Sequence, residues 1–109
     1  MKKIFLVLSL LLLIFITNSY AIDSGTYFCK DRVFNSKFQI ILKKSGRAKM
    51  LGLRGNWRDY DDEATIIDNQ TILEKTTDKK GNLMYLLIED RFVSARCVDK
   101  NSPYLKNMK

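Results

Sequence analysis

The residues best suited to chemistry lie in one stretch, KKSGRAKMLGLRGNWRDYDDE, at positions 43 to 63. It contains six Lys and Arg side chains, and arginines bind phosphate or carboxylate groups through paired hydrogen bonds. One Trp and one Tyr lie close to these cations and would add contact area to a bound partner. The stretch therefore predicts an anion-facing, partner-binding surface made of Lys43, Lys44, Arg47, Lys49, Arg54, Trp57, Arg58 and Tyr60.

The same stretch has a plainer interpretation, which we favour from the sequence alone. Lys and Arg commonly occupy the solvent-facing side of a strand without any partner. Trp57 is the only Trp of the chain, and a small domain that is short of apolar volume is expected to use it in the core. In this interpretation the cations are dispersed over a hairpin and Trp57 plugs a barrel.

Four carboxylates follow the cations and could bind calcium, since hard cations take several oxygen ligands from one loop. Their spacing lacks the Gly that the EF-hand pattern requires after its acidic positions. We interpret them as a solvated acidic turn that pairs with neighbouring arginines, and we predict neither a metal site nor a cofactor. These residues are Asp59, Asp61, Asp62 and Glu63.

Catalysis lacks its commonest side chains in this chain. There is no His, so a Ser or Cys nucleophile would lack its usual base, and neither Gly-x-Ser-x-Gly nor Ser-x-x-Lys occurs. Two of the carboxylates could serve as general acid and base, but no sequence feature places them in a cleft. We therefore expect no enzymatic activity, with a small carboxylate-dependent hydrolase as the alternative.

The elements that would position these residues are strands, because apolar residues recur with a period of two. The connecting segments are short and rich in Gly, Asn, Asp and Lys, which predicts an all-β antiparallel meander. Ser45-Gly46 is expected to form a two-residue hairpin turn, and LMYLLI a strand covered on both faces. The predicted strands are GTYFCK, KFQIILKK, RAKMLGLR, ATIID, TILEKTT, LMYLLI and RFVSARCV.

Cys29 and Cys97 are the only cysteines, one in the first predicted strand and one in the last. They lack the Cys-x-x-Cys spacing of a redox-active pair, so we predict a structural disulfide worth roughly 4 kcal/mol. A disulfide requires Cα atoms within about 7 Å. The first and last strands should therefore be neighbours, which closes the meander into a barrel, or should face each other in a sandwich.

The first 21 residues have the order of a secretory signal peptide, with Lys2 and Lys3 before an apolar run that is too short to span a bilayer. We predict a signal peptide helix at 1–21, a β-barrel domain at 22–98 and a flexible tail at 99–109. The protein is then expected to be exported, to the periplasm or out of the cell, and its mature chain should contain no transmembrane segment.

Loss of Lys2 and Lys3 would leave 17 cations against 12 carboxylates, a formal charge of +5. A basic exported protein should be attracted to anionic envelope surfaces or to an acidic protein. Nucleic acid is a less suitable partner, because the carboxylates are scattered among the cations. The oligomeric state stays open.

Several features together resemble the small lipocalin-like barrels of bacterial envelopes, including lysozyme inhibitors and the amino-terminal barrel of copper-resistance lipoproteins. They are Gly25-x-Tyr27-x-Cys29, FQIILKKSGRAKML, Gly55-x-Trp57, GNLMYLL and Cys97. The resemblance implies the fold and the compartment. The chemistry differs, because an inhibitor of a basic lysozyme should present acidic surface and no Cys-x-x-Cys is present for copper.

The leading hypothesis is a small exported, non-catalytic binding protein for an envelope or host protein or an anionic surface. The first alternative is the carboxylate-dependent hydrolase. The second is a structural module of the envelope, with LMYLLI as the contact if that strand is exposed.

Overall fold

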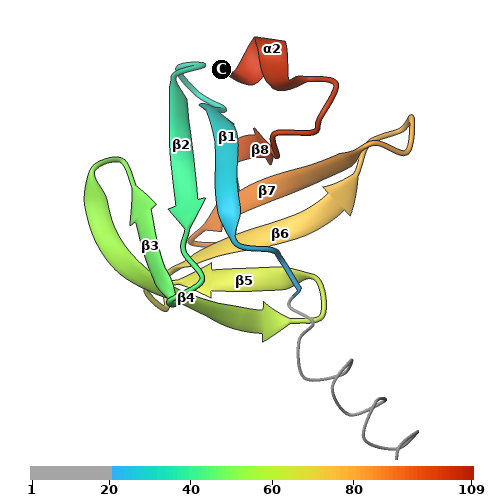
Figure 1. Ribbon diagram of the computed structural model, residues 1–109. Coiled ribbons are helices and arrows are strands. Elements are labelled where there is room, and N and C mark those ends of the chain that lie inside the picture. Colours follow the sequence, from blue (N-terminus) through green and yellow to red (C-terminus); the bar gives the residue numbers. More distant parts are fainter. Residues whose placement is uncertain (1–20) are drawn as a thin grey trace, which may run out of the picture.

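The computed structural model describes residues 21–109, so the predicted signal peptide lies outside the described residues except for Ala21. Eight antiparallel strands form a closed barrel in which each strand pairs with the next and β1 pairs with β8 (Figure 1). The elements are β1 (Gly25–Asp31), β2 (Lys37–Leu42), β3 (Arg47–Met50), β4 (Leu53–Asp61), β5 (Ala64–Ile67), β6 (Thr71–Thr77), β7 (Leu83–Glu89), β8 (Phe92–Val98) and the short helix α2 (Leu105–Met108).

The β1–β8 pairing places Cys29 directly opposite Cys97 in the register. The two residues form a disulfide, with their Cα atoms 4.0 Å apart. The predicted all-β fold, the disulfide and the barrel closure are therefore confirmed. Closure also pairs the backbone groups of both terminal strands, which would otherwise form exposed edges.

Period-two alternation sends one face of each strand into the barrel. In β1 and β2, the buried side chains include Tyr27, Cys29, Ile40 and Leu42, which alternate with more exposed neighbours as the period of two predicts. Tyr27 packs edge-to-face on Tyr85 of β7, with ring centroids 4.8 Å apart. Burial raises the pKa of both phenols, that of Tyr85 to about 12. The interior is thus filled by side chains, as is usual for eight-stranded barrels.

Two turns differ from the sequence prediction. The β2–β3 turn is closed by Gly46 N donating to Lys43 O at 3.0 Å, so Lys44 and Ser45 occupy its centre and Gly46 follows with φ 90°. RAKMLGLR is two strands rather than one, because Leu51 and Gly52 reverse the chain between β3 and β4. The apolar alternation did not reveal this turn, since Leu51 carries no turn signal.

The strand predicted from LMYLLI is β7, and its two faces differ. Tyr85 and Leu87 point into the barrel and are buried. Met84, Leu86 and Ile88 lie on the outer face and are only partly exposed. The prediction of cover on both faces therefore holds fully for the inner face and in part for the outer one.

The tail, predicted to be flexible, lies against the barrel. The helix α2 contacts β1 and β8, and Met108 is buried. The Tyr104 hydroxyl donates a hydrogen bond to the Asp78 carboxylate of the β6–β7 turn, and Lys37 Nζ donates to Lys109 O at 3.0 Å. The buried Met108 and these two polar contacts place the tail against the barrel.

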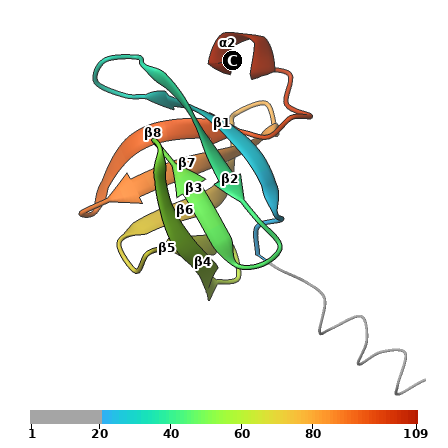
Figure 2. The ribbon, with the colours of Figure 1, turned by 60° about the vertical axis from the view of Figure 1, so that its left-hand side comes forward.

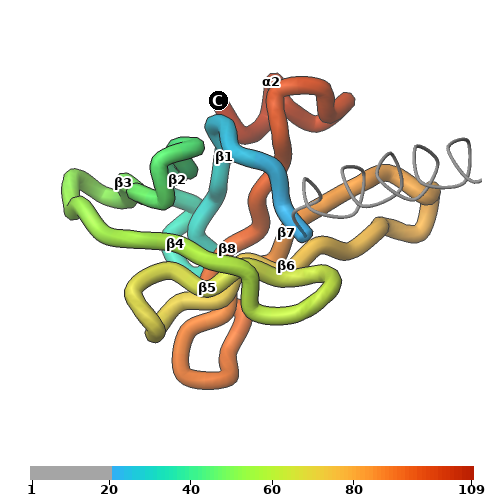
Figure 3. Tube along the Cα trace, turned by 60° about the horizontal axis from the view of Figure 1, so that its bottom comes forward, coloured from blue at the N-terminus to red at the C-terminus, as the bar shows by residue number. Residues whose placement is uncertain are grey.

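The connections separate into two ends of the barrel, because neighbouring strands run in opposite directions. The β1–β2, β3–β4, β5–β6 and β7–β8 connections lie at one end, which we call the rim end; the β2–β3, β4–β5 and β6–β7 connections lie at the other, the polar end. Figure 2 shows the β1–β2 and β7–β8 connections on the left and the β2–β3 turn on the right. Figure 3 shows the β3–β4 and β5–β6 turns opposite the β6–β7 turn.

Candidate functional site

The predicted cationic surface is partly assembled on the outer face of the β3–β4 hairpin. The register places Lys49 opposite Arg54 and Arg47 opposite Asn56. All four side chains are exposed, while Ala48 between them is buried. Three of the six predicted cations therefore share one solvent-facing surface, with Lys49 and Arg54 side by side.

Arg58 and Tyr60 also alternate to the outer face of β4, further along the strand than Arg54. Arg58 Nη2 donates to Asn69 Oδ1 at 2.9 Å, which directs the guanidinium across β5 to the β5–β6 turn. Tyr60 is 56% exposed. Both residues are thus separated from the Lys49–Arg54 pair.

Trp57 points to the opposite side of β4, into the barrel. It is 9% exposed, its Nε1 donates to Lys43 O at 2.7 Å, and its backbone N donates to Gly46 O at 2.9 Å. The indole therefore closes the polar end of the core. The burial of Trp57 agrees with the plainer interpretation of this residue as part of the core, and its part in partner binding stays a prediction.

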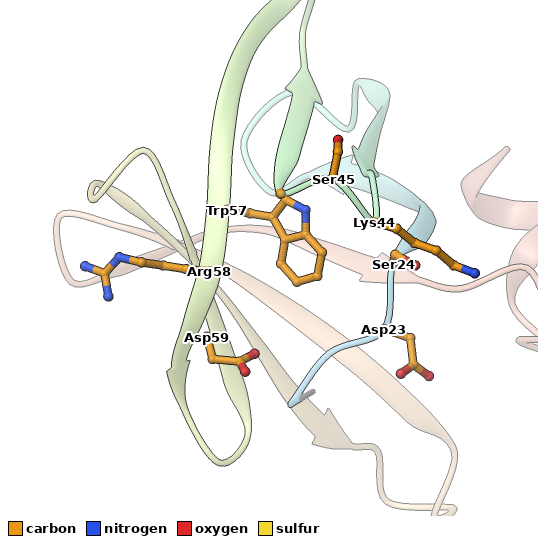
Figure 4. Close-up of a pocket in the computed structure, with 8 residues that line it drawn as sticks. Asp23, Ser24, Lys44, Ser45, Trp57, Arg58 and Asp59 are labelled. Atoms are coloured by element: carbon orange, nitrogen blue, oxygen red, sulfur yellow. The ribbon is translucent and has the colours of Figure 1, made fainter. Parts of the chain in front are cut away.

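Lys44 lies apart from the hairpin surface, at a depression of about 810 Å³ at the polar end. Figure 4 shows Trp57 facing this depression, Lys44 on the β2–β3 turn, and Arg58 directed away on the far side of β4. The depression is lined by Asp23, Ser24, Lys44, Ser45, Gly46, Trp57, Arg58 and Asp59.

Two carboxylates line this depression from different segments, Asp23 before β1 and Asp59 on β4. Asp59 Oδ1 accepts a hydrogen bond from the backbone N of Ala21 at 3.4 Å. The tip of the acidic stretch forms a turn, in which Asp61 Oδ1 accepts from Glu63 N at 2.8 Å. Within residues 21–109, no group of three or more His, Cys, Asp or Glu could hold a metal ion.

A second row of cations, which the sequence analysis missed, crosses the seam of the barrel. Lys37 of β2 lies opposite Lys30 of β1, and Lys30 lies opposite Arg96 of β8. Lys30, Arg96 and the nearby Arg32 line a groove of about 610 Å³ between the barrel wall and the tail. Lys30 and Arg96 are distant in sequence, so only barrel closure brings them together.

The carboxylates around this groove are engaged elsewhere. Asp31 Oδ2 accepts from the backbone N of Phe34 at 2.6 Å and of Val33 at 3.2 Å. The Tyr104 hydroxyl holds the pKa of Asp78 below its usual range, assisted by the backbone N of Asn82 and Lys80. Like charges at directly opposed positions destabilise a sheet, so an external anion would relieve both cationic rows.

Comparison of the chain with protein-family models, with curated proteins and with solved structures finds no match. The resemblance to lipocalin-like envelope barrels therefore stays a prediction. In the part of the chain from residue 21 onward, no helix is long and apolar enough to cross a membrane.

Proposed function

We propose that this protein is a small exported binding protein without catalytic activity, whose partner presents clustered negative charge. The observation that carries the proposal is the pair of cationic rows, Lys49–Arg54 on the hairpin and Lys37–Lys30–Arg96 across the seam. Each row places like charges opposite one another, which costs stability that a bound anionic partner would restore. Tyr60 lies apart from both rows and is not part of the proposed binding surface.

Export is supported by two independent features. The amino-terminal segment has the residue order of a secretory signal peptide. The single disulfide links the first strand to the last, and structural disulfides are typical of oxidising compartments such as the periplasm or the extracellular space. The partner would therefore be an envelope surface or an extracellular protein.

Binding to a soluble polyanion tests the proposal. We expect the protein from Ile22 onward to bind inorganic polyphosphate with an affinity that falls as salt rises, because exposed charges are screened. A Lys49→Ser, Arg54→Ser variant should bind at least about tenfold more weakly, equivalent to about 1.4 kcal/mol. Titration calorimetry at two salt concentrations gives both quantities.

A matched control removes the same charge elsewhere. Lys79→Ser, Lys80→Ser deletes two exposed lysines of the β6–β7 turn, at the polar end and outside both rows. This variant should retain the affinity of the parent protein. If the two variants lose affinity equally, net charge rather than the rows is responsible, and the proposed site is wrong.

The depression at the polar end favours a second candidate, the carboxylate-dependent hydrolase, because Asp23 and Asp59 both line it. Glycosidases use such pairs as acid and base or as acid and nucleophile. A panel of chromogenic glycosides assayed with the parent protein and with Asp23→Asn and Asp59→Asn variants tests it. Turnover that both substitutions abolish would establish an enzyme and contradict the binding proposal.

A further inference from the structure

Large apolar side chains are exposed at one end of the barrel. Of the six large hydrophobic residues that are well exposed within residues 21–109, all but Tyr60 lie on or beside rim-end connections. Their exposed fractions are far above those of ordinary core residues, and a small domain has few apolar side chains to leave in water. We call these five the apolar rim: Val33 (75%), Phe34 (82%), Leu51 (68%), Leu53 (72%) and Phe92 (75%).

The apolar rim is held in place by its turns. In the β1–β2 connection, the Asp31 carboxylate accepts hydrogen bonds from the backbone N–H groups of Val33 and Phe34. The backbone N of Arg32 donates a hydrogen bond to Ser94 O at 2.9 Å. The loop therefore presents its two apolar side chains outward from an ordered backbone. Such a presentation differs from the chance exposure of a loose segment.

Leu51 supplies an independent observation. Its φ is 52° and that of Gly52 is 78°, the left-handed pair that a two-residue hairpin turn needs, for which Asn-Gly is the favoured sequence. A leucine in this conformation costs stability relative to Asn or Gly. Neither turn chemistry nor core packing explains an exposed Leu here, which points to a contact outside the chain.

Each apolar part of the rim has an arginine next to it in the sequence. Arg32 precedes Val33, Arg54 follows Leu53, and Arg91 precedes Phe92. Arginine binds phosphate through paired hydrogen bonds. This alternation of apolar side chains and guanidinium groups is the pattern that an anionic lipid interface accepts, with apolar groups among the acyl chains and cations at the head groups.

We propose that the apolar rim docks on an anionic phospholipid bilayer, with Arg32, Arg54 and Arg91 at the lipid phosphates. The inference rests on the proposed function and names the anionic partner as a lipid surface. A second copy of the chain fits less well, because a symmetric contact would bring the same arginines together. The rim side chains also project from three separate connections. This arrangement suits insertion among lipids, which requires no complementary protein surface.

Vesicle binding tests the inference. The protein from Ile22 onward should sediment with vesicles of phosphatidylglycerol and phosphatidylcholine, and much less with phosphatidylcholine alone. A Phe34→Ser, Phe92→Ser variant should lose about tenfold or more in partition coefficient, because its apolar contact is removed. The matched control, Tyr60→Ser, removes the sixth exposed hydrophobic residue from the barrel wall and should bind as the parent protein does.

Leu51→Asn separates binding from folding. Asn is the better turn residue at this φ, so the variant should melt at the same or a higher temperature while it binds vesicles more weakly. If Leu51 has only a structural role, the variant should melt at a lower temperature and bind vesicles as the parent protein does, which would contradict the inference. Free glycerol phosphate, added in excess, should compete poorly, since it supplies the head-group phosphate without the apolar phase.

The outcomes separate the two proposals. Binding to polyphosphate without binding to vesicles would overturn the lipid inference and leave the proposed function standing. If the protein binds neither polyphosphate nor vesicles, the proposed function and the lipid inference are both wrong. Vesicle binding that is unchanged in the rim variants would assign the lipid contact to the cationic rows alone and overturn the rim. A dimer in solution that the rim substitutions dissociate would identify a second copy as the occupant, which also overturns it.

Discussion

The two ends of this barrel treat their large apolar side chains in opposite ways. At the polar end, the indole of Trp57 is buried in the barrel and donates a hydrogen bond to Lys43 O. Ile22 is buried as well, and the connections at this end carry Lys, Asp and Glu. At the rim end, Phe34 and Phe92 extend into solvent. Both ends belong to the same strands and the same closed sheet.

This difference shows that the exposed rim is not a consequence of a small core. The polar end demonstrates that the fold can bury a Trp at the mouth of the barrel and satisfy its N–H. The rim end uses connections of similar length to hold apolar groups outside. The exposure is therefore a local property of the rim connections, and a partner is the simplest physical reason for it.

The largest difference in the free energy of unfolding should come from replacing one aromatic residue at each end in separate variants. Trp57→Ala removes a buried side chain that closes the core, so the free energy of unfolding should fall by about 3 to 5 kcal/mol. Phe34→Ser should change it by no more than about 0.5 kcal/mol, because its ring contacts solvent. Urea unfolding followed by circular dichroism measures both.

Similar losses in the two variants would break the comparison between the ends. Trp57→Phe offers a finer measurement, since it keeps most of the apolar volume and removes the indole N–H. Its cost should be about 1 kcal/mol, the usual worth of one hydrogen bond.

An intermediate effect is expected from Gly55→Ala, near the rim end of β4. A Cβ at Gly55 would meet the Asp68 carboxylate, which accepts Asn56 N at 2.8 Å. The collision would displace that carboxylate, so unfolding should cost about 1 to 2 kcal/mol less than in the parent protein. In an Asp68→Ala background the same substitution should cost much less, and equal costs in both backgrounds would contradict the assigned contact.

The smallest effect should come from lowering the pH, and it concerns the hydrogen bond between Tyr104 and Asp78 of the β6–β7 turn at the polar end. Because the folded pKa of Asp78 is lowered, chiefly by the Tyr104 hydroxyl, its stabilising contribution is complete above the ordinary carboxyl pKa and is lost as the pH falls through the lowered value. Acidification from about pH 5 to about pH 2 should therefore lower the melting temperature of the parent protein more than that of Tyr104→Phe. Parallel decreases in the two proteins would show that the tail anchor does not titrate.

The predictions that depended on period-two alternation held for most of the strands. The burial of Tyr27, Ile40 and Leu42 follows the alternation of the sequence, since successive strand residues face opposite sides. Leu51 was missed for the same reason, because an apolar residue in a turn reads as the continuation of a strand. Met108 was missed because a single residue in a polar tail has no periodicity that could indicate burial.

The sequence by itself indicated most of the strands and the disulfide, because period-two alternation and a single pair of cysteines can be recognised without knowledge of the fold. It left open whether the disulfide closes a barrel or joins two sheets of a sandwich. It also located the cations of the hairpin. Only the tertiary structure decided which cations become neighbours: Lys30 meets Arg96 through the β1–β8 register, and Trp57 turns inward while Arg58 turns outward. It likewise gathered the five rim residues at one end, since chain direction reverses at every turn and sends alternate connections to opposite ends.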